Sequence, residues 1–179
     1  EQIGFYNHIT GDFSVLSERA FTGHSDSRYK PYYCKEIEML FFLEHAQDMD
    51  RVQLVCVRKD GRGRTVLLQD LEHYAIQVKP LESGNALVLA NRHLYLFNRF
   101  TRQLELKEQL IKDFFVIHDV DKILLHQMRD EQNYALEYRP DNPQRGVGTL
   151  VLCNFDFSNY QIIDEQVAHC YLYENQRLL

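Results

Sequence analysis

The chain has 179 residues, of which 45% are hydrophobic and 26% are charged, a balance that is ordinary for a globular protein and excludes a disordered one. This length fits a single β-rich domain over residues 1–179 with a core that needs no disulfide or metal. The formal net charge of -6 argues against nucleic acid as a partner, because phosphate contacts require clustered Lys and Arg. A basic or neutral protein partner suits it better.

Two further classes receive no support from the sequence. The longest apolar run, Met39 to Leu43, is far shorter than the roughly 18 residues that cross a bilayer, so no membrane partner is expected. The cysteines lie far apart, without a C-x-x-C pair, at Cys34, Cys56, Cys153 and Cys170. We interpret them as reduced core residues rather than as a disulfide framework, with a cytoplasmic location as the expectation.

The first third of the chain predicts a hairpin, a loop and an ambiguous segment. Apolar residues on both sides of Thr10-Gly11 predict a hairpin from Ile3 to Arg19, and polar residues predict an exposed loop from Thr22 to Pro31. The segment from Tyr32 to Met49 fits a strand and a helical face equally well.

The middle of the chain has the clearest strand signals. Val52 to Arg58 alternates, Asp60-Gly61 forms a turn, and Thr65 to Gln69 returns as the second strand of a hairpin. Further strand-like runs follow, separated by turn residues: Tyr74 to Val78, Ala86 to Ala90 and His93 to Phe97.

The last part of the chain begins with a second ambiguous stretch. Leu104 to Phe115 slightly favours a helix because of its Glu and Lys content. Arg139 to Gly148, rich in Pro, Gly, Asp and Asn, predicts a loop. The remaining predicted strands are Phe114–His118, Lys122–Gln127, Tyr134–Tyr138, Thr149–Phe157, Tyr160–Ile163 and Cys170–Tyr173. The predicted fold class is therefore mainly β, an antiparallel meander of hairpins with one or two short helices.

Three segments share an Asn after apolar residues, a short polar turn, and an apolar residue six positions after the Asn. They are FYNHITGDF at Asn7, LFNRFTRQL at Asn98 and LCNFDFSNY at Asn154. The basic hairpin around Arg58 falls between the first two, which predicts units of roughly 40 to 55 residues.

A segment such as HLYLFNRFTRQLEL resembles the middle strands of a β-propeller blade, where an apolar strand ends in a polar turn and a second strand follows. The chain contains no Trp, so it lacks the signature of the WD type. The resemblance implies about four blades, in a small propeller or a part of a larger one. A twisted meander or sandwich of hairpins stays the alternative.

The chemistry-bearing residues give one candidate cluster. His118, Asp119 and Asp121 are the types that hold a divalent metal or act as base and orienter, with His126 and Asp130 nearby. The same residues also fit a hairpin turn between two apolar strands. No G-x-S-x-G elbow or phosphate-binding glycine loop occurs, so no catalytic residue, cofactor or metal is assigned.

Two groups of charged residues are candidate partner-binding sites. The acidic group could face a basic partner and consists of Glu36, Glu38, Glu44, Asp48 and Asp50. The basic group could grip a phosphate, a nucleic-acid backbone or an acidic patch and consists of Arg58, Lys59, Arg62 and Arg64. Either group also fits a solvated surface.

The function favoured by these features is a non-enzymatic protein-binding module. A small acidic chain without a catalytic set is typical of an immunity or antitoxin protein, which inhibits a basic partner through charge complementarity. Alternatives are a metal-dependent hydrolase using His118, Asp119 and Asp121, and a β-propeller scaffold within a larger assembly. The oligomeric state is left open by the sequence.

Overall fold

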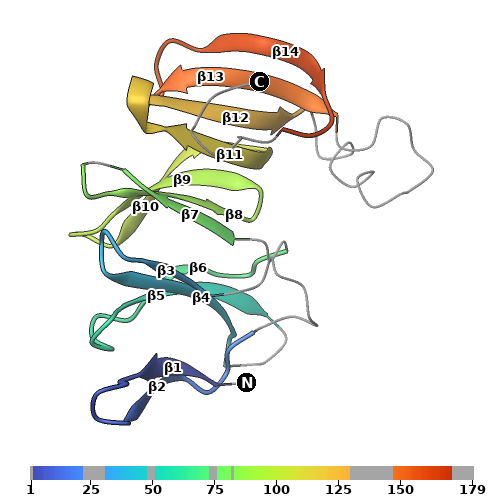
Figure 1. Ribbon diagram of the computed structural model, residues 1–179. Coiled ribbons are helices and arrows are strands. Elements are labelled where there is room, and N and C mark those ends of the chain that lie inside the picture. The colour runs from blue at the N-terminus through green and yellow to red at the C-terminus, as the bar shows by residue number, and fades with distance from the viewer. Residues whose placement is uncertain are drawn as a thin grey trace. The chain divides into compact units, whose positions relative to one another are not determined.

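The structure, a computed structural model, describes residues 2–21, 31–47, 51–72, 76–81, 83–129 and 147–170 (Figure 1). The chain divides into two compact units, residues 1–91 with 95–105 and residues 92–94 with 106–179. The expectation of one domain over residues 1–179 stays a prediction. Within the described ranges, no helix is long and apolar enough to span a membrane.

All named strands belong to antiparallel meanders in which sequence neighbours pair. The hairpin consists of β1 (Ile3–Tyr6) and β2 (Phe13–Ser17). The first four-stranded sheet consists of β3 (Tyr32–Cys34), β4 (Met39–His45), β5 (Val52–Arg58) and β6 (Thr65–Leu68). The second consists of β7 (Ile76–Pro80), β8 (Ala86–Ala90), β9 (His93–Asn98) and β10 (Gln103–Glu108). The third consists of β11 (Ile111–Ile117), β12 (Lys122–Met128), β13 (Gly148–Asn154) and β14 (Gln161–Val167).

Strand β4 is covered on both faces, which explains why the stretch from Tyr32 to Met49 fits both a strand and a helical face. Phe41 and Leu43 of β4 belong to a buried cluster with Phe97 of β9. On the opposite face, Leu40 and Phe42 pack with residues of the hairpin β1–β2. A strand buried on both faces loses the alternation of apolar and polar residues, so the stretch from Tyr32 to Met49 carried no clear period.

The helix slightly favoured for Leu104 to Phe115 is wrong, because β10 and β11 occupy this stretch. Strand β10 is the outermost strand of its sheet, and most of its residues are exposed or half-buried. The Glu and Lys content therefore reflects solvent exposure rather than helix formation. The helical part of the described residues is one 3-10 turn at His118–Val120.

The predicted hairpins are confirmed where the structure describes them. Strands β5 and β8 have the predicted bounds, and the hairpin β1–β2 turns between the predicted strands. In the second unit, Leu124 and Leu150 form a buried cluster with Ile117. Several predictions fall wholly or partly outside the described residues: the loops at 22–31 and 139–148, and the strands at 74–78, 134–138 and 170–173.

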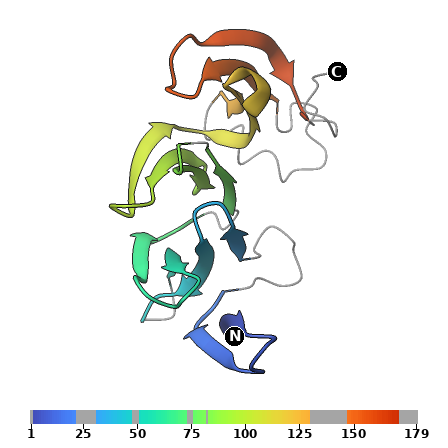
Figure 2. The ribbon, with the colours of Figure 1, turned by 60° about the vertical axis from the view of Figure 1, so that its left-hand side comes forward.

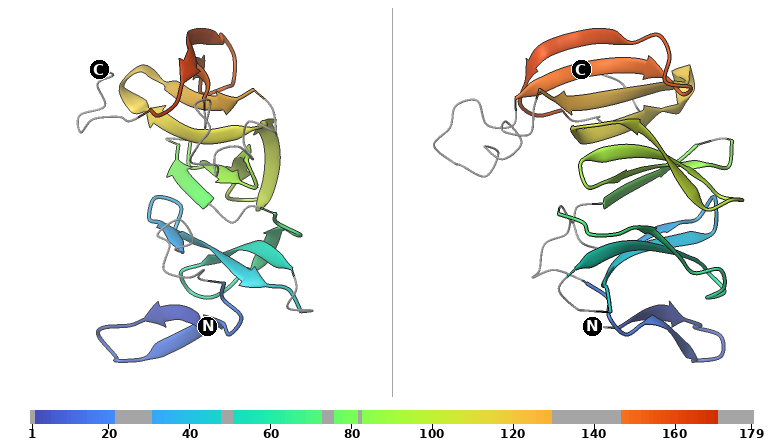
Figure 3. Two further views of the ribbon diagram at one scale, coloured as in Figure 1. Left: turned by 90° about the vertical axis from the view of Figure 1, so that its right-hand side faces the viewer. Right: turned by 180° about the vertical axis from the view of Figure 1, so that it is seen from behind.

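The repeated Asn turns occupy equivalent places, at the connections β1–β2, β9–β10 and β13–β14. Asn7 Oδ1 accepts hydrogen bonds from the N–H groups two and three residues later, at 3.0 and 3.4 Å. Asn98 Oδ1 does the same at 2.9 and 3.1 Å. In the two complete sheets with this motif, the turn joins the third strand to the fourth, as Figures 2 and 3 allow the reader to follow.

The turn at Asn154 has the geometry of the basic turn at Arg58. In both, the N–H of the first residue donates to the carbonyl of the fifth, at 2.9 Å for Asn154 and 3.1 Å for Arg58. In both, an Asp at the third position accepts the N–H of the fifth residue at 3.0 Å. Hydrogen bonding lowers the pKa of both Asp60 and Asp156. The basic turn between β5 and β6 of the first sheet therefore corresponds to the Asn turns that join the third and fourth strands of the other two sheets.

Candidate functional site

An arginine-lined pocket lies between the turns β5–β6 and β9–β10 of the first unit. Its volume is about 320 Å³, and its lining residues are Ile37, Glu38, Met39, Arg58, Arg99, Phe100 and Arg102. Ile37 and Met39 are buried and provide the apolar part of the lining. This size is at the lower end for ligand sites, so it suits one or two side chains rather than a large cofactor.

Local turn chemistry presents Arg99 and Phe100 to solvent. Because Asn98 Oδ1 caps the N–H groups of Phe100 and Thr101, the turn is closed without help from the side chains at its tip. Phe100 is 75% exposed. The Arg99 guanidinium carbon lies 4.5 Å from the centre of the Phe100 ring, a cation–π contact that leaves hydrogen-bond donors available.

Arg102 is held in the pocket by the neighbouring turn. Its Nη1 donates to the Gly63 carbonyl at 2.9 Å. Gly63 has a φ of +63°, and a Cβ at this position would lie 2.1 Å from Arg102 Nη1. This φ favours glycine, and a side chain here would displace the Arg102 guanidinium, so the second glycine of the KDGRGR segment leaves room for this arginine.

The pocket carries an excess of positive charge in a chain of net charge -6. Arg58 lies 3.7 Å from Asp60 in an exposed pair, which is a weak interaction. Glu38 is paired with Lys59, and this contact raises the Lys59 pKa, with the hydrogen bond as the largest cause. The lining therefore combines three arginines with one carboxylate that already has a cation.

A second depression of about 540 Å³ shares Arg102 with the pocket. Its other lining residues are Thr65, Val66, Leu67, Thr101, Gln103 and Leu104. These residues belong to or precede β6 and β10, and each of these strands is the outermost strand of its sheet. An outermost strand has one row of backbone groups without a strand partner, so this depression is a groove between two sheet edges.

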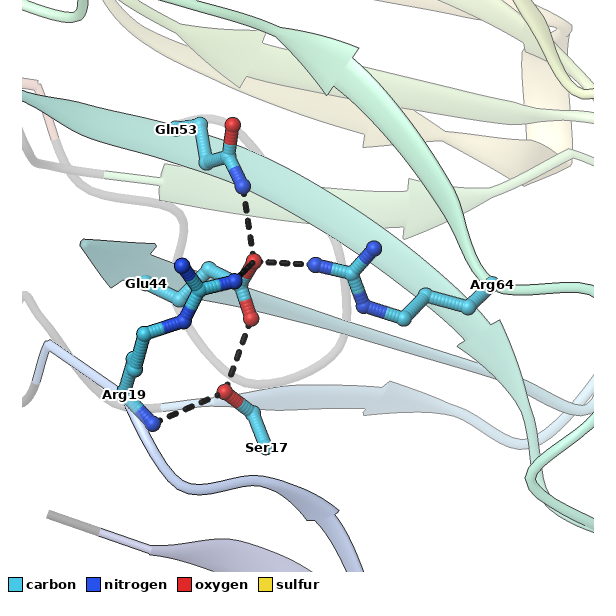
Figure 4. Close-up of polar contacts among 5 residues, drawn as sticks. All are labelled: Ser17, Arg19, Glu44, Gln53 and Arg64. Atoms are coloured by element: carbon cyan, nitrogen blue, oxygen red, sulfur yellow. Dashed lines mark hydrogen bonds and ion pairs between the residues drawn. The ribbon is translucent and has the colours of Figure 1, made fainter. Parts of the chain in front are cut away.

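The basic group predicted from the sequence is divided by the structure. Arg58 lines the pocket, Lys59 contacts Glu38, and Arg62 is exposed beside them. Arg64 instead donates to the carboxylate of Glu44 (Figure 4).

The predicted acidic group is divided as well. The Glu44 side chain is 1% exposed and also accepts hydrogen bonds from Ser17 Oγ and Gln53 Nε2, each at 2.7 Å. Arg19 lies 3.8 Å away. We call this set the Glu44 cluster; it joins β2, β4 and β5, and its carboxylate is closed to a partner.

The other acidic residues lie elsewhere. Glu36 and Glu38 are exposed in the turn between β3 and β4, and the Cys34 thiol lies 3.6 Å from a Glu36 oxygen. Burial raises the pKa of this thiol to about 11, so it stays protonated at neutral pH. Asp48 and Asp50 lie outside the described residues. Binding of a partner by the acidic or the basic group stays a prediction.

The candidate catalytic cluster lies at a turn. His118 and Asp119 are in the 3-10 turn, and Asp121 is its left-handed C-cap, with its N–H 3.3 Å from the His118 carbonyl. The His118 ring packs edge-on against Phe155, with 6.0 Å between ring centres. Across the described part of the chain, no three His, Cys, Asp or Glu residues come together as a metal site would require. His126 is buried on β12, with Nε2 2.8 Å from the Val167 carbonyl.

Sequence reasoning missed Arg99, Phe100 and Arg102 as site residues. They belong to the Asn98 repeat, whereas the predicted basic group lies on one hairpin alone. Since the Asn98 turn and the Arg58 turn occupy the same position in successive repeats, an alignment of the repeats would have brought the two sets of arginines to attention.

Comparison with solved structures shows the fold class. The chain is similar to the β-propeller domain of the Trilobed protease from Pyrococcus furiosus, described as having an open velcro topology, with 11% identity and a TM-score of 0.56. The fold is of the β-propeller type. The alignment covers 93% of this chain and 50% of that one, so the chain spans about half the length of that domain. No family model matches the chain, and no curated protein matches it.

Proposed function

We propose that the chain is a non-enzymatic protein-binding module of the β-propeller type, which holds a partner at the turns β5–β6 and β9–β10. The observation that supports this function is the arginine-lined pocket, where Arg58 and Arg99 come from two different sheets. Arginine and aromatic residues are both enriched at protein interfaces. The blades then act as a scaffold that keeps these turns in place.

The narrower form of this proposal is an immunity-type inhibitor of a basic partner. It requires an exposed acidic face, and among the described members of the acidic group that face consists of Glu36 and Glu38. Glu38 already has Lys59 as its partner, and Glu44 is buried. The positive pocket favours an acidic region of the partner instead, since charge complementarity directs association.

Affinity capture with the 179-residue chain as bait tests the proposed function. We expect a dominant partner in extracts of the native source, and we expect the Arg58→Ala/Arg99→Ala double variant to lose most of it. Arg51→Ala is the matched control, because Arg51 precedes the same strand that Arg58 ends, roughly 23 Å away at the rise of a strand. A partner retained equally by all three baits would contradict binding at this pocket.

A further inference from the structure

The chemistry of the pocket and of the adjoining groove defines a class of partner. This inference rests on the proposed function, because it concerns the same site. Arg58, Arg99 and Arg102 present planar guanidinium groups that pair with carboxylates through two parallel hydrogen bonds. Two of these arginines, Arg58 and Arg99, are exposed at the end of a strand or in a turn, where a partner can reach them.

The groove that shares Arg102 adds a second requirement. It lies between β6 and β10, whose outer edges have no strand partner among the described residues and can pair with the backbone of an added strand. A peptide that pairs in this way is extended, and its side chains alternate between two faces. One face then directs every second side chain toward the sheets, where Leu67 and Leu104 offer apolar contact.

We propose that the pocket and the groove together bind an extended acidic segment of a partner protein. The backbone of the segment lies between the edges of β6 and β10, and its carboxylates contact Arg58, Arg99 and Arg102. A segment with alternating acidic and apolar residues fits best, because the lining contains both arginines and apolar side chains. Nucleic acid fits less well, since the chain has a net charge of -6 and the groove offers apolar and backbone groups.

Fluorescence anisotropy with a labelled heptapeptide of alternating glutamate and valine, capped at both ends, tests this inference on the full 179-residue chain. We expect saturable binding that weakens steeply when NaCl is raised from about 50 mM to about 300 mM. A peptide with glutamine in place of glutamate measures the contribution of charge. A peptide of the same composition with all glutamates before all valines measures the contribution of alternation. Both control peptides should bind about tenfold more weakly or not at all.

Variants locate the binding site. Arg58→Ala and Arg99→Ala should each weaken binding of the alternating peptide about tenfold, since each removes a charge-assisted hydrogen bond. Arg51→Ala should leave affinity within about twofold. Urea unfolding of each variant checks that the fold is intact, which is expected because these side chains are exposed.

Four results would overturn the inference: no binding of the alternating peptide, equal binding of the glutamine peptide, equal loss in Arg51→Ala, or preferential binding of inorganic phosphate, a phosphoserine peptide or single-stranded DNA. These failures are distinct from failure of the proposed function. A captured partner that depends on Arg58 and Arg99, together with no binding of acidic peptide, would retain the module and refute the acidic segment. Arginine-dependent binding of the acidic peptide without any captured partner would show that the pocket accepts acidic peptide and would count against the proposed protein partner.

Discussion

Arg58 and Arg64 lie at the two ends of the connection between β5 and β6, and one faces an open pocket while the other contacts a buried carboxylate. Arg64 donates to the buried carboxylate of Glu44, which Ser17 and Gln53 also contact. Arg58, only a few residues earlier, lines an open pocket with Arg99 and contacts an exposed Asp60 at 3.7 Å. The Glu44 side chain is buried among these donors, whereas the pocket keeps positive charge available. The same residue type therefore has a buried acceptor at one position and, in the proposed function, contacts a partner at the other.

The largest expected effect concerns the closed cluster. Glu44→Ala removes the common acceptor of Ser17, Gln53 and Arg64, and urea unfolding should show a loss of about 3 kcal/mol, because buried polar groups lose their partners. Glu36→Ala is the matched control, since this carboxylate is exposed, and its effect should stay within about 0.5 kcal/mol. Equal effects of the two variants would mean that the closed cluster does not stabilise the fold.

The next largest effect concerns Gly63, whose carbonyl accepts a hydrogen bond from Arg102 of the pocket. Gly63→Ala forces a side chain onto a φ of +63° and into the guanidinium of Arg102. We expect a loss of about 1 to 2 kcal/mol in urea unfolding, together with weaker binding of acidic peptide, because Arg102 must move. Gly11→Ala has a similar φ of +78° with no atom within 4 Å of the added Cβ, so it should lower stability alone. Unchanged peptide affinity in Gly63→Ala would show that Arg102 is not positioned by this glycine.

Several of these residues could be predicted from the sequence and others could not, for physical reasons. Strand β5 was predicted with its observed bounds because Asp60-Gly61 marks its turn, and Arg58 stood out as part of a basic cluster. The predicted acidic group rests on charge alone, which does not reveal that Glu44, two residues after Phe42 on β4, lies on the same buried face. Arg99 is distant in sequence from Arg58, and only the packing of successive sheets brings the two together.

A smaller effect concerns Glu38, the carboxylate in the lining of the arginine pocket. Glu38→Gln removes the carboxylate that pairs with Lys59 and leaves the backbone unchanged. Affinity for acidic peptide should rise about two- to threefold, because the variant removes a carboxylate that repels the ligand and releases the exposed Lys59 ammonium from its ion pair. Anisotropy titrations measure the change, and Glu105→Gln serves as an exposed control outside the pocket. Weaker binding by Glu38→Gln would imply that Glu38 itself contacts the partner.

The smallest effect is a pH dependence in the basic turn. The Arg62 N–H holds the pKa of Asp60 below its ordinary value, so its contribution to stability is present above that ordinary pKa and is lost as pH falls through the lowered one. Asp60→Asn should slightly flatten the acid limb of a stability profile measured by urea unfolding. Asp156→Asn, in the equivalent turn of the second unit, should do the same. An unchanged acid limb in both would show that these turns do not depend on ionised aspartate.

The most direct test of the account measures both stability and peptide affinity for Arg64→Ala and Arg58→Ala. Arg64→Ala should lower the free energy of unfolding by about 1 to 2 kcal/mol, because Glu44 stays buried with fewer donors, and should leave peptide affinity within about twofold. Arg58→Ala should change stability by less than about 0.5 kcal/mol and weaken binding about tenfold. A contradiction would be the same pattern in both variants, whether both lose stability or both lose binding.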